Sequence, residues 1–171
     1  MVGDRGELVS QRVAFRSGGR RSIVAESEER TGVKEVEVKE VWQQLESDPN
    51  AQLIDVRTRA EWAVVGVPDL SGLGKQPILI EWQTFPDGQV NPSFVDQLIS
   101  DLVASGVGQH TNLYFICRSG GRSLAAARAM AEAGFRACHN VTEGFEGPPD
   151  ASRHRGTVEG WKAADLPWVQ G

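Results

Sequence analysis

Cysteine is scarce in this sequence of 171 residues, which holds only Cys117 and Cys138. Two cysteines do not make the disulfide framework of a small secreted domain, and no cysteine or histidine spacing resembles a zinc site. Long apolar runs are absent as well, and none approaches the roughly 18 residues that a membrane-spanning helix needs. We therefore expect a cytoplasmic protein with reduced thiols, no bound metal and no membrane contact.

Basic residues do not exceed acidic ones, because the formal net charge is −5. This balance disfavours nucleic acid and anionic membranes as partners. Hydrophobic residues make up 40% of the chain, which is enough for one globular domain with a core. Residues 1–32 are rich in Arg, Ser, Gly and Glu without regular periodicity, and we interpret them as a flexible leader. Residues 33–171 are predicted to form the domain.

Short apolar runs alternate with helical patterns along this domain. The predicted strands cover residues 33–38, 51–56, 77–82, 112–117 and 136–141. The predicted helices cover residues 39–50, 58–65, 92–106 and 122–135, and the tail, residues 142–168, mixes loop with a short closing helix. In the second helix Thr58 and Glu61 have the spacing of a capping box. Alternation of this kind predicts an α/β domain, with a mostly parallel sheet of about five strands and helices on both faces.

One cysteine lies where such a sheet places its ligands, outside the carboxyl ends of the strands. Cys117 follows an apolar strand and precedes an Ala-rich helix, and glycines and arginines separate the two. We expect Gly120 and Gly121 to adopt positive φ, so that successive N–H groups surround one point. The helix N-terminus, Arg118 and Arg122 add positive charge, and together these features favour a thiolate. The sequence thus predicts a nucleophilic Cys117 in an anion-binding loop, whose members are Arg118, Ser119, Gly120, Gly121, Arg122 and Ser123.

A cysteine followed by a loop and an arginine occurs in two chemistries. Cysteine phosphatases have five residues between the cysteine and the arginine, whereas Cys117 and Arg122 are separated by four. The shorter loop makes a tighter cup, which suits a single sulfur atom on the thiolate better than a tetrahedral phosphate. In addition, Ile116 stands where many phosphatases have histidine. A phosphatase or arsenate-reductase-like enzyme remains the alternative.

Three segments together resemble single-domain rhodaneses, which are sulfurtransferases. They are residues 53–62 (LIDVRTRAEW), 115–123 (FICRSGGRS) and 139–147 (HNVTEGFEG). The resemblance extends over roughly Val33 to Trp168. It implies a rhodanese-like fold and a Cys117 nucleophile. Residues 66–92 depart from the family, since they lack the short H-I-x-G-A element that usually follows the Asp-Val-Arg motif.

The resemblance implies a ping-pong reaction without metal or organic cofactor. Cys117 would take the outer sulfur of thiosulfate or of a persulfide donor, and the loop amides would hold the resulting persulfide. Cyanide or a thiol would then accept that sulfur. Arg118 and Arg122 would attract the anionic donor and stabilise the leaving sulfite. A sulfur-carrying or sensing module with little thiosulfate activity is a further alternative, and the sequence leaves the oligomeric state open.

Other polar residues near the predicted site are interpreted as structural support. Asp55, Arg57 and Glu61 lie beside a buried strand, where charges must be paired or hydrogen-bonded. We expect these three residues to pair with one another and to fix the loop that follows the strand. Cys138 lies on a predicted strand and is expected to be a buried structural thiol.

Overall fold

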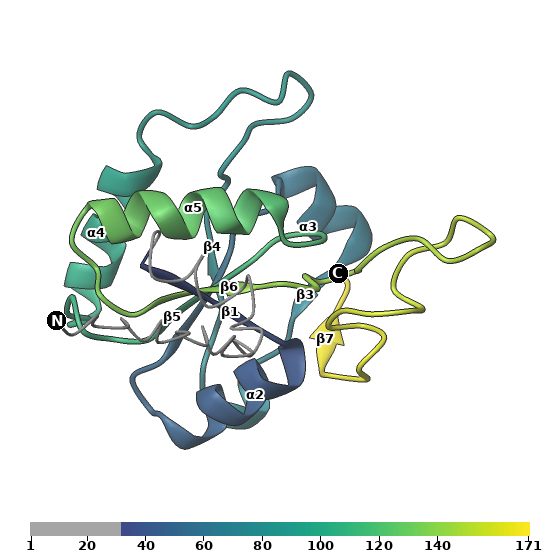
Figure 1. The fold of residues 1–171 in the computed structure, drawn as a ribbon, viewed down its shortest axis with the longest axis horizontal. Coiled ribbons are helices and arrows are strands. Elements are labelled where there is room, and N and C mark those ends of the chain that lie inside the picture. Colours follow the sequence, from purple (N-terminus) through teal and green to yellow (C-terminus); the bar gives the residue numbers. More distant parts are fainter. Residues whose placement is uncertain (1–31) are drawn as a thin grey trace, which may run out of the picture.

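A parallel five-stranded sheet forms the centre of the protein (Figure 1). The computed structural model describes residues 32–171, so all of the predicted leader except Gly32 lies outside the described residues. The strands in spatial order are β1 (Val33–Val36), β6 (Cys138–Val141), β5 (Leu113–Ile116), β2 (Gln52–Asp55) and β4 (Ile78–Leu79). Every neighbouring pair is parallel, which confirms the predicted fold class.

Helices cover both faces of this sheet. Figure 1 shows α5 (Gly121–Glu132) above the strands and α2 (Val38–Ser47) below them. Because side chains alternate along a strand, adjacent residues of one strand contribute to the hydrophobic cores on opposite faces of the sheet. Ile54 and Phe115 pack with α5 and with α4 (Phe94–Ala104). The adjacent residues Leu53 and Tyr114 pack with α2 on the opposite face.

Four-residue spacing explains which side of each helix is buried. On α2, Val41 and Leu45 are fully buried, and the same interval on α4 buries Phe94, Leu98 and Leu102. The helix α3 (Arg59–Val65) begins with the predicted capping box, since Thr58 and Glu61 bond reciprocally. None of the α3 residues is buried.

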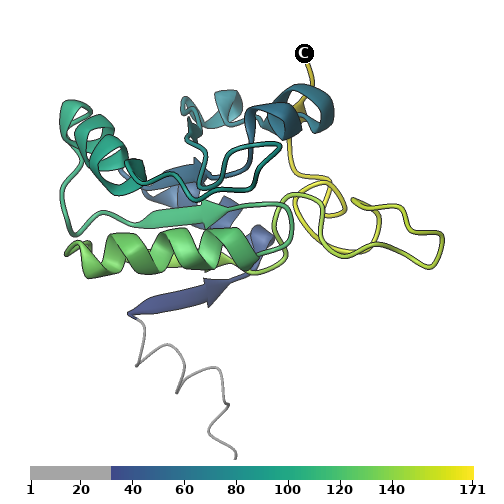
Figure 2. The same ribbon diagram turned by 90° about the horizontal axis from the view of Figure 1, so that it is seen from above.

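The C-terminal segment differs from its predicted conformation. Residues 142–171 contain turns and the short strand β7 (Trp168–Val169), and the predicted closing helix is wrong. Gly144, Gly147, Gly156 and Gly160 have φ between +65° and +98°, which a right-handed helix does not accommodate. The strand β7 instead pairs antiparallel with β3 (Val67–Pro68). Figure 2 shows this segment projecting beyond the carboxyl ends of the sheet strands.

The edge strand of the sheet is shorter than predicted. The predicted strand at residues 77–82 shrinks to the two residues of β4, and a 3₁₀ turn, η1 (Ser71–Leu73), precedes it. None of the helices within residues 32–171 is long and apolar enough to cross a bilayer.

Candidate functional site

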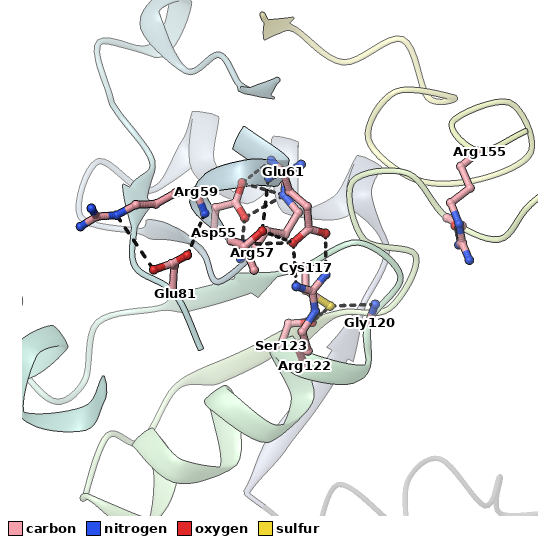
Figure 3. A network of polar contacts seen from close by, with 12 residues as sticks. Asp55, Arg57, Arg59, Glu61, Glu81, Cys117, Gly120, Arg122, Ser123 and Arg155 are labelled. Carbon is pink, nitrogen blue, oxygen red and sulfur yellow. Dashed lines mark hydrogen bonds and ion pairs between the residues drawn. The ribbon is translucent and has the colours of Figure 1, made fainter. Parts of the chain in front are cut away.

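The predicted nucleophile lies at the carboxyl edge of the sheet (Figure 3). Cys117 immediately follows β5. On the adjacent strand β2, the last residue is Asp55, which is in register with Ile116 of β5. Cys117 is only 1% exposed. A second sulfur bonded to Sγ would extend about 2.05 Å further from the buried thiol.

Gly120 donates the first hydrogen bond to the cysteine sulfur. Its backbone N–H lies 3.1 Å from Cys117 Sγ, and its φ is +98°. A Cβ at this position would collide with the carbonyl oxygen of Thr142, so both the backbone angle and the available space require glycine. Gly121 differs from its prediction: it has no positive φ, opens α5, and has nothing close to a Cβ position.

Ser123 supplies the second polar contact of the sulfur. Its Oγ lies 3.2 Å from Cys117 Sγ and 2.6 Å from Asn140 Oδ1. The Asn140 amide is fixed in this orientation because its Nδ2 donates to Glu35 Oε2 over 2.9 Å. A serine hydroxyl has one proton. Ser123 therefore donates either to Asn140 or to a sulfur anion, and the site offers a thiolate or persulfide up to two hydrogen bonds.

The loop that follows β6 supports the cysteine loop from behind. The N–H of Phe145 donates to the carbonyl oxygen of Cys117 over 2.8 Å, and the N–H of Glu146 donates to that of Arg118 over 3.0 Å. Gly144 has φ +70°, and a Cβ there would strike the backbone of Arg118. These contacts use the carbonyl groups of Cys117 and Arg118 and so fix the backbone of the loop, whose Gly120 N–H contacts the sulfur.

The two arginines of the loop have different environments. Arg118 is exposed, and it forms no ion pair with any residue between 32 and 171. Arg122 binds Glu61 through two hydrogen bonds of 2.7 and 2.8 Å. Burial by itself would raise the pKa of Glu61. Hydrogen bonds from Arg122 and Thr58 outweigh that effect and lower the pKa to about 2.

The hydrogen bonds from Arg122 to Glu61 also raise the pKa of Arg122, so both members of the pair are charged at neutral pH. The positive charge of Arg122 lies near enough to interact electrostatically with Cys117. However, its guanidinium is occupied by a carboxylate, which leaves Arg118 as the uncompensated cation of the loop. The sequence had assigned the same role to both arginines.

The predicted set of Asp55, Arg57 and Glu61 is divided in the structure. Asp55 and Arg57 form a completely buried ion pair with a shortest N–O distance of 2.6 Å. Arg57 also donates to the carbonyl oxygen of Gly66 over 2.8 Å, and its guanidinium lies 4.1 Å from the ring centre of Phe145. Arg57 thereby connects β2, the end of α3 and the loop behind Cys117, whereas Glu61 joins α3 to α5.

Cys138 lies apart from this site. It pairs in register with Leu113 at the amino end of β5, four residues before Cys117. Four residues of strand span roughly 13 Å. Cys138 is 1% exposed, and burial raises the pKa of its thiol to about 12.

The sequence reasoning missed Asn140, Glu35 and the support by Phe145. One signal was present: Asn140 is a polar residue within the short strand β6, where its side chain is buried. Buried amides require hydrogen-bond partners, so this position indicates a polar contact inside the fold. Glu35, 105 residues earlier in the chain, gave no such signal.

Comparison with known proteins gives a consistent family. A family model described as the STR4 middle domain matches residues 32–171. An uncharacterized protein of Rickettsia conorii is 39% identical over 124 residues, which are 72% of this chain and 87% of that protein. The rhodanese-like domain-containing protein 4, chloroplastic, of Arabidopsis thaliana is 30% identical over 132 residues, which cover 77% of this chain and 25% of the plant protein.

Solved structures agree on the fold. The crystal structure of Rv0390 from M. tuberculosis has a TM-score of 0.71 and 43% identity, and the match covers 80% of this chain and 97% of that one. The polysulfide-sulfur transferase homodimer from Wolinella succinogenes has a TM-score of 0.53 at 18% identity, with 86% and 89% of the two chains covered. At that identity the second likeness supports the fold alone.

Proposed function

The chain is a rhodanese-like domain of the STR4 middle-domain family, and from that premise we propose that it is a sulfurtransferase with Cys117 as the sulfur carrier. The observation that carries the proposal is the environment of Cys117 Sγ. Its contacts are the N–H of Gly120 at 3.1 Å and the hydroxyl of Ser123 at 3.2 Å. The N–H of Gly120 donates to an anion on sulfur, and the hydroxyl of Ser123 does so when it turns away from Asn140.

In the proposed first half-reaction, Cys117 thiolate attacks the outer sulfur of thiosulfate. A new S–S bond forms, the S–S bond of thiosulfate breaks with its electron pair on sulfite, and Cys117 becomes a persulfide anion. In the second half-reaction, cyanide or a thiolate attacks the outer sulfur and leaves with it. Thiolate Cys117 is regenerated, and neither step requires a metal or an external oxidant. A persulfide donor replaces thiosulfate in the same scheme.

The charge arrangement favours this reaction over phosphate-ester hydrolysis. A phosphatase arginine binds phosphate oxygens through both arms of its guanidinium. Here the corresponding guanidinium, that of Arg122, already holds Glu61 through two hydrogen bonds. Arg118 is exposed at the mouth of the loop and can still attract the anionic donor and stabilise the leaving sulfite.

The test is direct observation of the persulfide. Full-length protein is incubated with thiosulfate, and its intact mass is measured before and after cyanide is added. We expect a gain of one sulfur atom on the peptide with Cys117, and its removal with stoichiometric thiocyanate. Cys117→Ser should lose both steps because a hydroxyl has no accessible anion at neutral pH. Cys138→Ser is the matched control and should still load.

Three outcomes would change the proposal. Loading from an organic persulfide but not from thiosulfate would replace the donor and leave the role of Cys117 intact. Failure to load from either donor in a folded protein would overturn the proposed function. Hydrolysis of aryl phosphates faster than thiocyanate formation would make the phosphatase interpretation the better one.

A further inference from the structure

We propose that a cleft beside the cysteine loop binds the organic part of the sulfur acceptor, and that this acceptor is a thiol with an apolar substituent and an anionic group. This inference rests on the proposed function, because it names the compound that takes the sulfur from Cys117. The cleft has a volume of about 470 Å³ and is lined by residues of α3, by residues 83–86 and Gly88, and by the two loop arginines. Cyanide is far smaller than such a cleft.

Two unusually exposed apolar side chains form part of its wall. Val64 on α3 and Phe85 are each 70% exposed, the highest values among the large hydrophobic residues that the structure describes. Both line the same cleft, together with Val65 and Pro86. Scattered single apolar residues on a surface require no explanation, but a cluster next to a reactive group indicates a binding surface.

The part of the wall that carries Phe85 is a hydrogen-bonded hairpin. Gln83 and Val90 form an antiparallel bridge, and the N–H of Thr84 donates to the carbonyl oxygen of Gln89 over 2.9 Å. The Thr84 hydroxyl also bonds the carboxylate of Asp87 at 2.6 Å. A preformed wall reduces the entropy lost when a ligand binds. This hairpin lies in the segment whose sequence departs from the rhodanese pattern.

The charge of the cleft lining defines the second feature of the ligand. Arg118, Arg122 and Glu61 are its charged lining residues. Glu61 and Arg122 neutralise each other, so the unpaired charge is the positive one of Arg118. A ligand that places its apolar group against Phe85 would therefore bring a carboxylate or similar anion to Arg118. Its thiolate would then face the cysteine loop, where it attacks the outer sulfur of the persulfide, breaks the S–S bond and leaves as an organic persulfide.

Two thiols that differ by one phenyl ring test this inference. Protein loaded with thiosulfate reacts with 2-mercaptopropionate or with 2-mercapto-3-phenylpropionate, and persulfide loss is followed by intact mass. We expect the phenyl compound to react about tenfold faster at limiting concentration. Phe85→Ala should reduce that ratio about three- to tenfold, the range of an aromatic contact, and should leave the rate with cyanide unchanged.

Val103→Ala is the matched control, because Val103 is 66% exposed on α4 and lies outside the lining of the cleft. It should keep the wild-type ratio. A second measurement requires no sulfur transfer: 3-phenylpropionate should protect Cys117 from alkylation by iodoacetamide better than propionate does, and Phe85→Ala or Arg118→Gln should weaken this protection.

The outcomes separate the inference from the proposed function. If wild-type protein fails to load from any donor, the proposed function is lost, while the protection assay still decides whether the cleft binds such a ligand. Equal rates and equal protection for the compounds with and without the ring would overturn the inference although loading succeeds. A dimer that Phe85→Ala dissociates would assign the apolar wall to a second copy of the chain and would also overturn it.

Discussion

Replacing Glu61 by Gln removes one partner of the ion pair that joins α3 to the start of α5. The pKa of Glu61 falls from its ordinary 4.5 to about 2 because the bonds from Arg122 and Thr58 outweigh burial. That difference corresponds to about 3 kcal/mol of stability at neutral pH. Each side chain of the pair keeps about a fifth of its surface exposed. Solvent screening therefore reduces the expected loss in Glu61→Gln to about 2 kcal/mol.

The loss should depend on pH in a defined direction. The pKa of Glu61 is lower in the folded than in the unfolded protein, so its contribution is fully present above 4.5 and disappears as the pH falls toward 2. The stability difference between wild type and Glu61→Gln should thus be constant from pH 7 to about pH 5. More than half of it should be lost by pH 3, because below pH 4.5 the unfolded chain binds a proton at Glu61 that the folded protein, with its lower pKa, does not bind.

Denaturant unfolding of both proteins at pH 7, 5, 4 and 3 measures this difference. Arg59→Gln is the matched control, because Arg59 forms an exposed 4.0 Å ion pair with Glu81 and its replacement should cost little at any pH. A difference between wild type and Glu61→Gln that stays the same from pH 7 to pH 3 would refute the reasoning. So would a cost no larger than that of Arg59→Gln.

Three further predictions concern the neighbouring residues. Gly120→Ala should abolish persulfide formation and destabilise the protein, because Gly120 has φ +98° and a Cβ there would collide with Thr142. Gly121→Ala should leave persulfide formation and stability unchanged. Intact mass measures persulfide formation, and denaturant unfolding measures stability. Arg57→Leu should cost about 3–5 kcal/mol in the free energy of unfolding, since it leaves the carboxylate of Asp55 buried without a partner; a loss under 1 kcal/mol would contradict this. Native Cys138 should resist iodoacetamide at pH 8, where its buried thiol with a pKa of about 12 stays protonated, and equal labelling of both cysteines would contradict that.

The fold could be predicted because its signals are local. Alternating apolar runs and helical patterns specify a parallel sheet, and the capping box at Thr58 marks the start of α3 within one residue. The closing helix failed for an equally local reason. Gly160 and Asp165 both have positive φ, which leaves only residues 161–164 between them for a right-handed helix.

Only the part of the site that lies in one continuous segment of the sequence could be predicted. Cys117 and its loop are adjacent in sequence, so their proximity needed no tertiary information. The sequence predicts that Glu61 pairs with Arg57, and only the tertiary structure shows that it binds Arg122 instead. Glu35 reaches Asn140 because β1 and β6 are neighbours in register, and Asn140 in turn accepts a hydrogen bond from Ser123; no local pattern reveals either contact.

The order of strands explains why these distant residues converge on one thiol. In the spatial order β1–β6–β5–β2, the strand β5, which Cys117 directly follows, lies between β6 and β2. On one side of Cys117, β2 ends at Asp55 and is followed by Arg57. On the other side lie Asn140 of β6 and the loop that contains Phe145. Arg57 connects the two sides through its contact with the ring of Phe145. The buried ion pair of Asp55 and Arg57 therefore fixes the backbone around the cysteine loop, whereas Gly120 and Ser123 contact the sulfur itself.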